Sequence, residues 1–310
     1  MSAIMITEPI APSVVETILR KGYKVQTEYG PPNPDVTPDE IEAVIVRTRP
    51  IDRPWMDQYP NLKIIAYHGV GIDGIDLVTA RARGIRVTTT PGQNSLSVAE
   101  HALSLMLALA KQLVPVATDY KAKGFDCKYS HQYIELSGRT LGLLGMGNIG
   151  YRVAQMAHNG FGMRVLVYDP FLKEGKPGIE LVSDRMEVFR QADFVSLHLP
   201  LLPSTQQSVG MAEFKAMKPS AFLINCARGA IVNQQELIQA LQNGEIAGAG
   251  LDVTDPEHCE IGDPLLSLPN AIVTPHIAAS SEESLVRVAS MCLESIEAVL
   301  AGKEPQGAVV

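Results

Sequence analysis

Long apolar runs are missing from this sequence, and so are targeting signals. The most apolar long stretch, Ala102 to Ala110, is about half of the roughly 18 residues that a transmembrane helix needs. The N-terminal residues lack a basic segment followed by a long apolar one, so we expect no signal peptide and a cytoplasmic location. The sequence ends at Val310, and we expect no C-terminal regulatory domain.

Paired cysteines and an excess of positive charge are missing as well. The four cysteines are far apart and form no Cys-x-x-Cys pair, which is typical of reduced thiols. Glu257, His258 and Cys259 are adjacent, but no second ligand pair at zinc spacing accompanies them, so we expect no metal. The net charge of −8 argues against nucleic acid as a partner.

What the sequence does contain is an alternation of short apolar strands and helices. Its 310 residues leave room for two globular domains. The pattern predicts strands at 4–7, 23–27, 43–47, 62–67, 140–144, 163–168, 193–197, 221–225, 247–252 and 271–274, and helices at 12–21, 76–83 and 281–300. Strands that alternate with helices indicate an α/β fold with parallel sheets covered on both faces.

The middle of the chain departs from this alternation. Ser97 and Glu100 have the spacing of a capping box, which predicts a long apolar helix from His101 to about Leu113. The polar stretch from Lys121 to Tyr133 is predicted to be irregular.

A dinucleotide fingerprint follows the strand at 140–144. Gly145 suits a tight turn, Gly147 lets the backbone approach a pyrophosphate, and Gly150 lets the next helix lie close to the strand. The helix N-terminus offers unpaired N–H groups to phosphates. Asp169 ends the next strand 19 residues after Gly150, where a ribose-binding carboxylate is expected. Because a carboxylate would repel a 2′-phosphate, Asp169 favours NAD over NADP.

Catalytic groups are expected at the carboxyl ends of the strands, where ligands bind in open α/β sheets. Arg228 offers a two-pronged donor for a carboxylate. His276 can exchange a proton with a carbonyl oxygen near neutral pH, and Glu257 beside that ring would favour the imidazolium and orient it. His198 and Asp252 also stand at strand ends. Arg, Glu and His together suit the reduction of a 2-keto acid by hydride from a nicotinamide.

These residues lie in a series of motifs that resembles the D-2-hydroxyacid dehydrogenase family, which includes phosphoglycerate dehydrogenase. The resemblance runs along nearly the whole chain. Its motifs are Gly69–Asp76, Thr90–His101, the fingerprint with Tyr168–Pro170, His198–Thr205, Met217–Val232, Asp252–Glu257 and Thr274–Ala278.

The resemblance implies roles for individual positions. Arg228, Glu257 and His276 match the substrate-binding arginine, the paired carboxylate and the acid/base histidine. The expected substrate-binding residues are Arg47, Gly69, Val70, Gly71, Arg228 and His276, with the backbone amides of the glycine loop holding the substrate carboxylate. The expected cofactor contacts are Thr90, Gly145, Gly147, Asn148, Ile149, Gly150, Asp169, His198, Leu199, Pro200, Thr205, Cys226, Ala227, Arg228, Asp252, His276, Ala278 and Ala279.

The late position of the fingerprint indicates that a separate α/β unit precedes it. The resemblance implies two Rossmann-like or flavodoxin-like parallel-sheet domains. In this arrangement an NAD-binding domain at 97–282 is inserted in a substrate-binding domain at 1–96 and 283–310, with the reaction cleft between them. It also implies a homodimer formed through the helix after Ser97.

Other functions compete with this interpretation. Tyr67 stands where many phosphoglycerate-type members carry arginine, which counts against a phosphorylated substrate unless Arg47 or Arg49 supplies the charge. A dinucleotide-sensing protein that resembles the transcriptional corepressors of this architecture is an alternative, but the chain is acidic and contains no low-complexity segment for recruiting partners. Oxidation of formate or phosphite is a third possible function. Glu257 counts against formate, because related formate dehydrogenases carry glutamine at that position.

Overall fold

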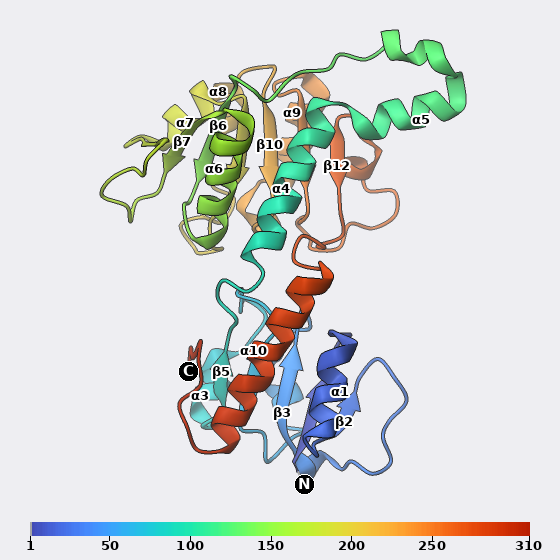
Figure 1. The fold of residues 1–310 in the computed structure, drawn as a ribbon, viewed down its shortest axis with the longest axis vertical. Helices are drawn as coiled ribbons and strands as arrows, with labels where there is room; N and C mark the ends of the chain where they lie inside the picture. The colour runs from blue at the N-terminus through green and yellow to red at the C-terminus, as the bar shows by residue number, and fades with distance from the viewer. Residues whose placement is uncertain (1) are drawn as a thin grey trace. The chain divides into compact units, whose positions relative to one another are not determined.

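The computed structural model describes residues 2–310, which form two compact units (Figure 1). The first unit comprises the chain up to Asn94 together with Ala279–Val310. The second unit is Ser95–Ala278, so it is inserted in the sequence of the first. Which unit binds which ligand, and the domain limits expected from the sequence, remain predictions.

The first unit is built on a five-stranded parallel sheet with the order β2-β1-β3-β4-β5. This is a doubly wound, flavodoxin-like order, in which the chain reverses direction across the sheet after β2. Its strands are β1 (Ala3–Ile6), β2 (Lys24–Thr27), β3 (Ile41–Val46), β4 (Ile64–Tyr67) and β5 (Arg86–Thr88).

Helices cover both faces of this sheet, as the apolar strands require. On one face, α1 (Pro12–Arg20) and α10 (Glu282–Leu300) bury Ile18 and Ile296 against β1 and β3. On the other face, α2 (Arg53–Met56) and α3 (Leu77–Ala82) lie against the same strands, with Trp55 in the core. Strands buried on both faces show runs of apolar residues and no polar alternation.

The second unit is built on a seven-stranded parallel sheet with the order β12-β11-β10-β9-β6-β7-β8. Its strands are β6 (Thr140–Leu144), β7 (Arg164–Tyr168), β8 (Ile179–Leu181), β9 (Phe194–Leu197), β10 (Phe222–Asn225), β11 (Gly248–Leu251) and β12 (Ala271–Val273). The order reverses between β6 and β9, and ligands bind at such switch points in open α/β sheets.

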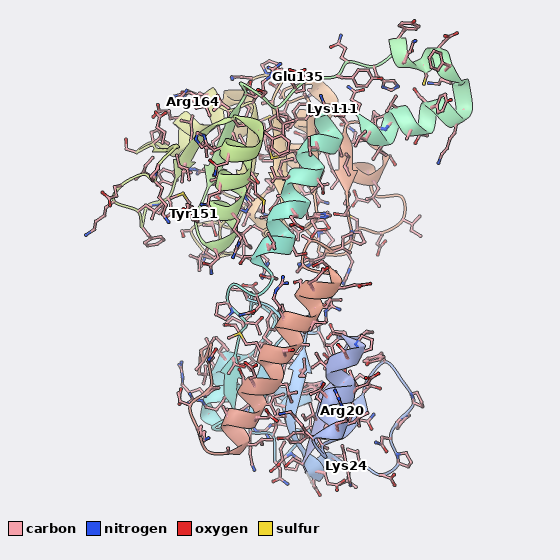
Figure 2. The ribbon with its side chains drawn as sticks, viewed as in Figure 1. Arg20, Lys24, Lys111, Glu135, Tyr151 and Arg164 are labelled. Atoms are coloured by element: carbon pink, nitrogen blue, oxygen red, sulfur yellow. The ribbon has the colours of Figure 1, made fainter. Side chains whose placement is uncertain are left out.

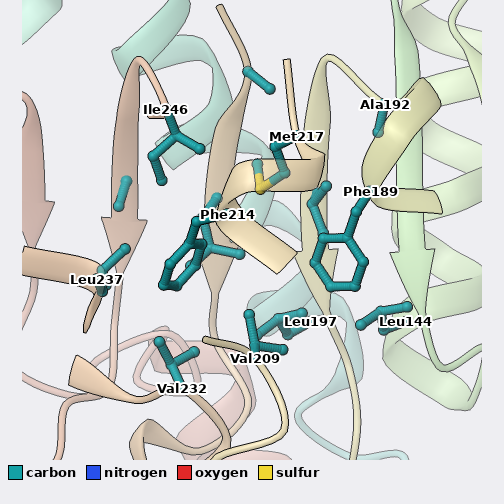
Figure 3. Close-up of a cluster of buried hydrophobic side chains, with 14 of the residues drawn as sticks. Leu144, Phe189, Ala192, Leu197, Val209, Phe214, Met217, Val232, Leu237 and Ile246 are labelled. Atoms are coloured by element: carbon teal, nitrogen blue, oxygen red, sulfur yellow. The ribbon is translucent and has the colours of Figure 1, made fainter. Parts of the chain in front are cut away.

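One face of this sheet carries α4 (Ser95–Ala110) and α6 (Asn148–Phe161), which contact each other (Figure 1). The other face carries α7 (Arg185–Gln191), α8 (Met211–Ala216) and α9 (Gln234–Asn243). Figure 3 shows the core beneath them, where Phe189 and Phe214 are fully buried beside Leu197. Short 3₁₀ segments complete the secondary structure: η1 (Pro38–Glu40), η2 (Phe125–Tyr129), η3 (Gly229–Ile231) and η4 (Pro264–Ser267).

The structure corrects the predicted capping box. Helix α4 begins at Ser95, so Ser97 and Glu100 lie within the helix and do not cap it. Ser97 is 8% exposed, and its hydroxyl donates to the carbonyl oxygen of Ala278 at 2.6 Å. A residue that resembles an N-cap in the sequence therefore makes a tertiary hydrogen bond.

The structure also corrects the prediction for the segment after α4. Helix α5 (Leu113–Lys123) was not predicted, and η2 occupies part of the stretch expected to be irregular. Together they form an arm that leaves α4 after Ala110 and returns at Ile134, whose N–H donates to Ala110 O at 2.9 Å. Figure 2 labels Lys111 near this junction, where its Nζ donates to Ile134 O at 2.7 Å.

Among residues 2–310, no single helix has the length and apolar character to cross a membrane. Helices α4 and α5 pass that test only as a pair, and they are bent by 48° at the break between them.

Candidate active site

The predicted site residues of the second unit follow one row of paired strand positions. Val273, Leu251, Asn225, Leu197, Leu144 and Tyr168 are successive partners across six adjacent strands. The residues that follow this row, in the same order of strands, are His276, Asp252, Arg228, His198, Gly145 and Asp169. Parallel pairing therefore brings the fingerprint and the candidate catalytic residues to one edge of one sheet.

The glycine turn has the geometry that a dinucleotide site needs. Gly145 has φ of +91°, and a Cβ there would lie 2.6 Å from the carbonyl oxygen of His198. A Cβ on Gly150 would lie 2.4 Å from Gly145 O. At Gly147, by contrast, a Cβ would meet nothing within 4 Å, so its backbone faces open space. Gly145 and Gly150 thus allow the close approach of strand and helix, and Gly147 leaves room for a ligand.

Helix α6 starts at this turn without a side-chain cap. Its N-cap residue is Gly147, which has no side chain to accept from the first N–H groups of the helix. Asn148 and Ile149 are the first helical residues. Uncapped N–H groups at the positive end of a helix dipole suit a phosphate, so this turn fits the pyrophosphate of NAD.

Asp169 contacts the glycine turn directly. Its Oδ2 accepts from Met146 N at 2.9 Å and its Oδ1 from Phe171 N at 3.0 Å. A carboxylate has about four acceptor positions, so two remain for ribose hydroxyls. The sequence predicted that Asp169 binds the ribose of the cofactor. In the structure, Asp169 also accepts a hydrogen bond from the backbone of the fingerprint turn.

The segment after β9 lies against the same turn. Both the backbone of His198 and the Leu199 side chain come close to Gly145, and His198 Nε2 lies 3.0 Å from Ser196 Oγ. Thr205 closes the following loop, since its hydroxyl donates to Pro200 O at 2.7 Å.

Arg228 stands in a turn that Asn225 organises. The buried Asn225 side chain accepts from Ala227 N at 3.0 Å and donates to Arg228 O at 2.9 Å. Arg228 Nη1 donates to Ala227 O at 2.7 Å. Gly229 is required next to it, because a Cβ there would lie 1.8 Å from Thr254 O.

The structure brings His276 and Glu257 together. His276 Nδ1 contacts Glu257 Oε1, and the two side chains are 36% and 39% exposed. His276 has φ of +52°, a left-handed conformation that is uncommon for a residue with a side chain. With Nδ1 on the carboxylate, Nε2 is the ring nitrogen that remains for a substrate.

Cys226 is a poor nucleophile in this setting. Burial, and then the negative charge of Asp252, raise the pKa of its thiol, which therefore stays protonated at neutral pH. Among the described residues, no group of three or more His, Cys, Asp or Glu side chains is placed to hold a metal ion.

In the first unit, Arg47, Gly69 and Thr90 follow β3, β4 and β5. Arg47 Nη1 donates to Pro9 O at 2.7 Å. The Thr90 hydroxyl donates to Gly69 O at 3.1 Å, which ties Thr90 to the glycine loop that also contains Val70 and Gly71.

Sequence analysis missed Glu8, which holds the loop that carries Arg47. Its carboxylate accepts from Arg47 N at 3.0 Å, from Thr48 N at 2.7 Å and from Arg49 N at 2.8 Å. Burial acts to raise the pKa of Glu8, but these hydrogen bonds, with those from the Thr7 and Thr48 hydroxyls, lower it to about 2. A lone acid after a strand gives no sign of this role, because the donors arrive from β3.

Two half-buried histidines make stability sensitive to acid. Burial lowers the pKa of His68 to about 4, with the charge of Arg47 as a second cause, and burial alone lowers the pKa of His198 to about 4. Because both folded-state values lie below the ordinary 6.5, the unfolded chain binds more protons between pH 6.5 and 4. Stability is therefore fully present above that window and decreases as the pH falls through it.

We expect each histidine to contribute at most about 3 kcal/mol to this loss. Urea unfolding at a series of pH values from 7 to 4 measures the free energy of unfolding. This free energy should decrease less with falling pH for His68→Gln than for the wild type. In His258→Gln, at an exposed histidine, it should decrease as much as in the wild type. Equal slopes for His68→Gln and the wild type would contradict the assignment.

The chain belongs to the D-isomer specific 2-hydroxyacid dehydrogenase family. Residues 103–278 match the family described as "D-isomer specific 2-hydroxyacid dehydrogenase, NAD binding domain". This match confirms the resemblance and NAD as the cofactor, and the similarity to solved structures of the family confirms the two-domain α/β fold. Nothing in the matches supports the corepressor alternative.

Individual relatives show the same relationship. The chain is 39% identical to a glyoxylate reductase of Korarchaeum cryptofilum, over 91% of this chain and 87% of that protein. It is 35% identical to a D-3-phosphoglycerate dehydrogenase of Methanocaldococcus jannaschii, but there it spans all of its own length and only 59% of the relative's. The crystal structure of the TT0316 protein from Thermus thermophilus matches with a TM-score of 0.90 and 37% identity, covering 99% of this chain and 100% of that one.

Proposed function

We propose that this protein interconverts a small 2-keto acid and its D-2-hydroxy acid by NAD-dependent hydride transfer at C2. The observation that carries the proposal is the row of paired positions across six strands, because it brings the glycine turn, Arg228 and the His276–Glu257 pair to one edge of the sheet. The cofactor binds at the positive end of α6, and when bound NADH supplies the hydride.

The protein's own side chains bind the substrate and transfer one proton to or from it. Arg228 forms a two-pronged ion pair with the substrate carboxylate, which orients the neighbouring carbonyl. His276 holds a proton at Nε2 and gives it to the carbonyl oxygen in reduction, or takes it from the hydroxyl in oxidation. Glu257 fixes Nδ1 and stabilises the positive charge that His276 carries before it gives up the proton.

The roles of the first unit remain part of the proposal. We propose that the backbone amides of Gly69, Val70 and Gly71 donate hydrogen bonds to the substrate carboxylate, and that Arg47 also binds the substrate. Tyr67 ends β4 immediately before this loop, and we propose that it makes the protein prefer an unphosphorylated substrate. The names of the two curated relatives fit either choice, since one names glyoxylate and the other a phosphorylated acid.

A screen of NADH oxidation tests the function. The substrates are glyoxylate, hydroxypyruvate, pyruvate, bulkier 2-keto acids and phosphohydroxypyruvate, and the reverse reaction uses paired D- and L-2-hydroxy acids with NAD. We expect turnover of an unphosphorylated 2-keto acid and oxidation of the D-enantiomer alone. No turnover on any of these acids would reject the proposal, and faster turnover of phosphohydroxypyruvate than of hydroxypyruvate would reject the role of Tyr67.

We expect replacement of Asp169 by Ser, together with Pro170→Arg, to shift the cofactor preference toward NADP. The change removes the carboxylate that receives the ribose hydroxyls and adds a cation for a 2′-phosphate. Loss of one charged hydrogen bond, worth roughly 1.5–3 kcal/mol, lowers kcat/KM with NADH at least about tenfold. Steady-state kinetics with both cofactors measures this, and Asp169→Asn separates the loss of charge from the loss of the Met146 contact. A wild type that already prefers NADPH would contradict the argument.

We propose that the protein is a cytoplasmic homodimer, formed through the helix after Ser97 as expected and also through the α5–η2 arm that follows it. Large apolar side chains on this arm are exposed: Leu113 by 52%, Val114 by 55%, Tyr120 by 58%, Phe125 by 67% and Tyr129 by 79%. Several large exposed apolar side chains on one segment favour an interaction surface. Light scattering should give twice the chain mass, and Phe125→Asp with Tyr129→Asp should give a folded monomer. A monomeric wild type would reject the proposal.

We also propose that the partner of the protein is a small acid substrate, and not a nucleic acid or a membrane.

A further inference from the structure

Asp252 holds the backbone on both sides of His276. Its side chain has no exposed surface. Oδ1 accepts from Thr274 Oγ1 at 2.6 Å and from Ile277 N at 2.9 Å, and Oδ2 accepts from Ala278 N at 2.8 Å. The backbone oxygen of Asp252 accepts from His276 N at 2.9 Å. The turn from Thr274 to Ala278 is thus fixed before, at and after the histidine.

This fixation is needed because His276 is in an unfavourable conformation. A residue with a side chain at φ of +52° is strained by roughly 1–3 kcal/mol and keeps that conformation only where its surroundings impose it. If the turn relaxed to negative φ, the ring would be redirected and its contact with Glu257 would be lost.

Helix α4 also contacts this turn. His101 Nε2 lies 3.0 Å from Thr274 Oγ1, and the Ser97 hydroxyl donates to Ala278 O at 2.6 Å. Ser97 and His101 are four residues apart and so lie on one face of the helix, one turn from each other. They reach the first and the last residue of the turn.

The bonding pattern settles which ring nitrogen of His101 carries a proton. The Thr274 hydroxyl has one proton, which it donates to Asp252 Oδ1 at 2.6 Å. The hydroxyl oxygen must therefore accept from His101, so Nε2 carries hydrogen. The same Nε2 lies 3.5 Å from Asp252 Oδ1, so its N–H is also near the buried carboxyl group.

We propose that His101 and Ser97 are positioning residues for the acid/base step. His101 holds the Thr274–Ala278 turn through Thr274, and Ser97 holds it through Ala278, so that His276 keeps its left-handed backbone and its ring stays on Glu257. The inference rests on the proposed role of His276, and it assigns a function to the face of α4 that the sequence pattern had presented as a helix cap.

The test compares His101→Ala, His101→Gln and Glu100→Gln, with His276→Ala as the reference. We expect His101→Ala to lower kcat at least about tenfold while KM and the Kd for NADH stay within about twofold, since the interaction acts on the proton-transfer step. The pH at half-maximal kcat should move by at least about half a unit. In His101→Gln the side-chain amide can donate from the position of Nε2 and should restore most of the rate. Glu100, the exposed preceding residue on α4, is the matched control and should behave as wild type when changed to Gln.

A second readout does not depend on turnover. In protein labelled with ¹³C-histidine, the ring resonance of His276, assigned by its disappearance in His276→Ala, should shift in His101→Ala and return in His101→Gln. Ser97→Ala should shift it in the same direction by less, because it removes one of the two contacts of α4 with the turn.

The outcomes separate this inference from the proposed function. An unmoved resonance and an unchanged kcat in His101→Ala overturn the inference, and so does an equal loss of melting temperature and rate in the Ala and Gln variants, which would indicate a purely structural role. Full turnover in His276→Ala, or no 2-keto acid turned over by the wild type, overturns the proposed function instead, and the resonance then decides the inference about the turn.

Discussion

His276→Ala should lower kcat by roughly 10²–10⁴-fold, the usual contribution of a positioned general acid or base. Its Nδ1 contacts Glu257 and its backbone N–H donates to Asp252, so the substitution removes an imidazole that is held in place at this edge of the sheet. NADH affinity, measured by fluorescence titration, should change by less than about threefold, since the glycine turn is untouched.

Two further variants sharpen this prediction. Glu257→Gln keeps a side-chain oxygen near Nδ1 but removes the charge, so its kcat should fall between those of the wild type and His276→Ala. His258→Ala removes an exposed histidine adjacent to Glu257 and should leave kcat unchanged. A His276→Ala protein that binds NADH and retains more than about a tenth of the wild-type kcat would rule out the acid/base role.

Arg228→Gln should lower kcat/KM for the 2-keto acid by roughly 10²–10³-fold. Truncating one partner of a desolvated charge pair costs about 2–5 kcal/mol, and the substrate carboxylate would be left without its two-pronged donor. Arg228→Lys restores the charge but not the planar pair of donors, so it should recover only part of the loss.

Steady-state kinetics on the best substrate of the screen measures these values. Arg190→Gln is a suitable control, because Arg190 is an exposed arginine on α7 that pairs with Asp184; its kcat/KM should stay within about twofold of the wild type. Equal kcat/KM for Arg228→Gln and the wild type would show that the substrate carboxylate binds elsewhere.

Local patterns in the sequence were sufficient for most of the strands and for the fingerprint. Strand β6 runs from Thr140 to Leu144 as predicted, and α10 begins directly after Ser281, whose hydroxyl accepts from Ser284 N. These elements depend on runs of apolar residues and on caps within a few residues, which are properties of a short segment. The arm formed by α5 and η2 was missed, because its helix carries a weak apolar pattern and has no buried residue.

The candidate site also contains residues that local patterns predicted and contacts that they did not. Gly145, Arg228, Glu257 and His276 were predicted from residue type and place, since ligands bind at the carboxyl ends of strands in open α/β sheets. The contacts made by Asp252, His101 and Glu8 were not found, because their partners are separated from them in the sequence by at least 22 residues and meet them only through strand pairing and helix packing.

The sequence by itself determined the fold class, the cofactor and the residue types available for chemistry, because these follow from periodicity, glycine spacing and the chemistry of side chains. Only the tertiary structure decided how His276 is held. Its left-handed backbone is held by a buried carboxyl group directly after β11 and by a hydroxyl and an imidazole from α4. No local pattern specifies interactions between elements that come together from distant parts of the chain.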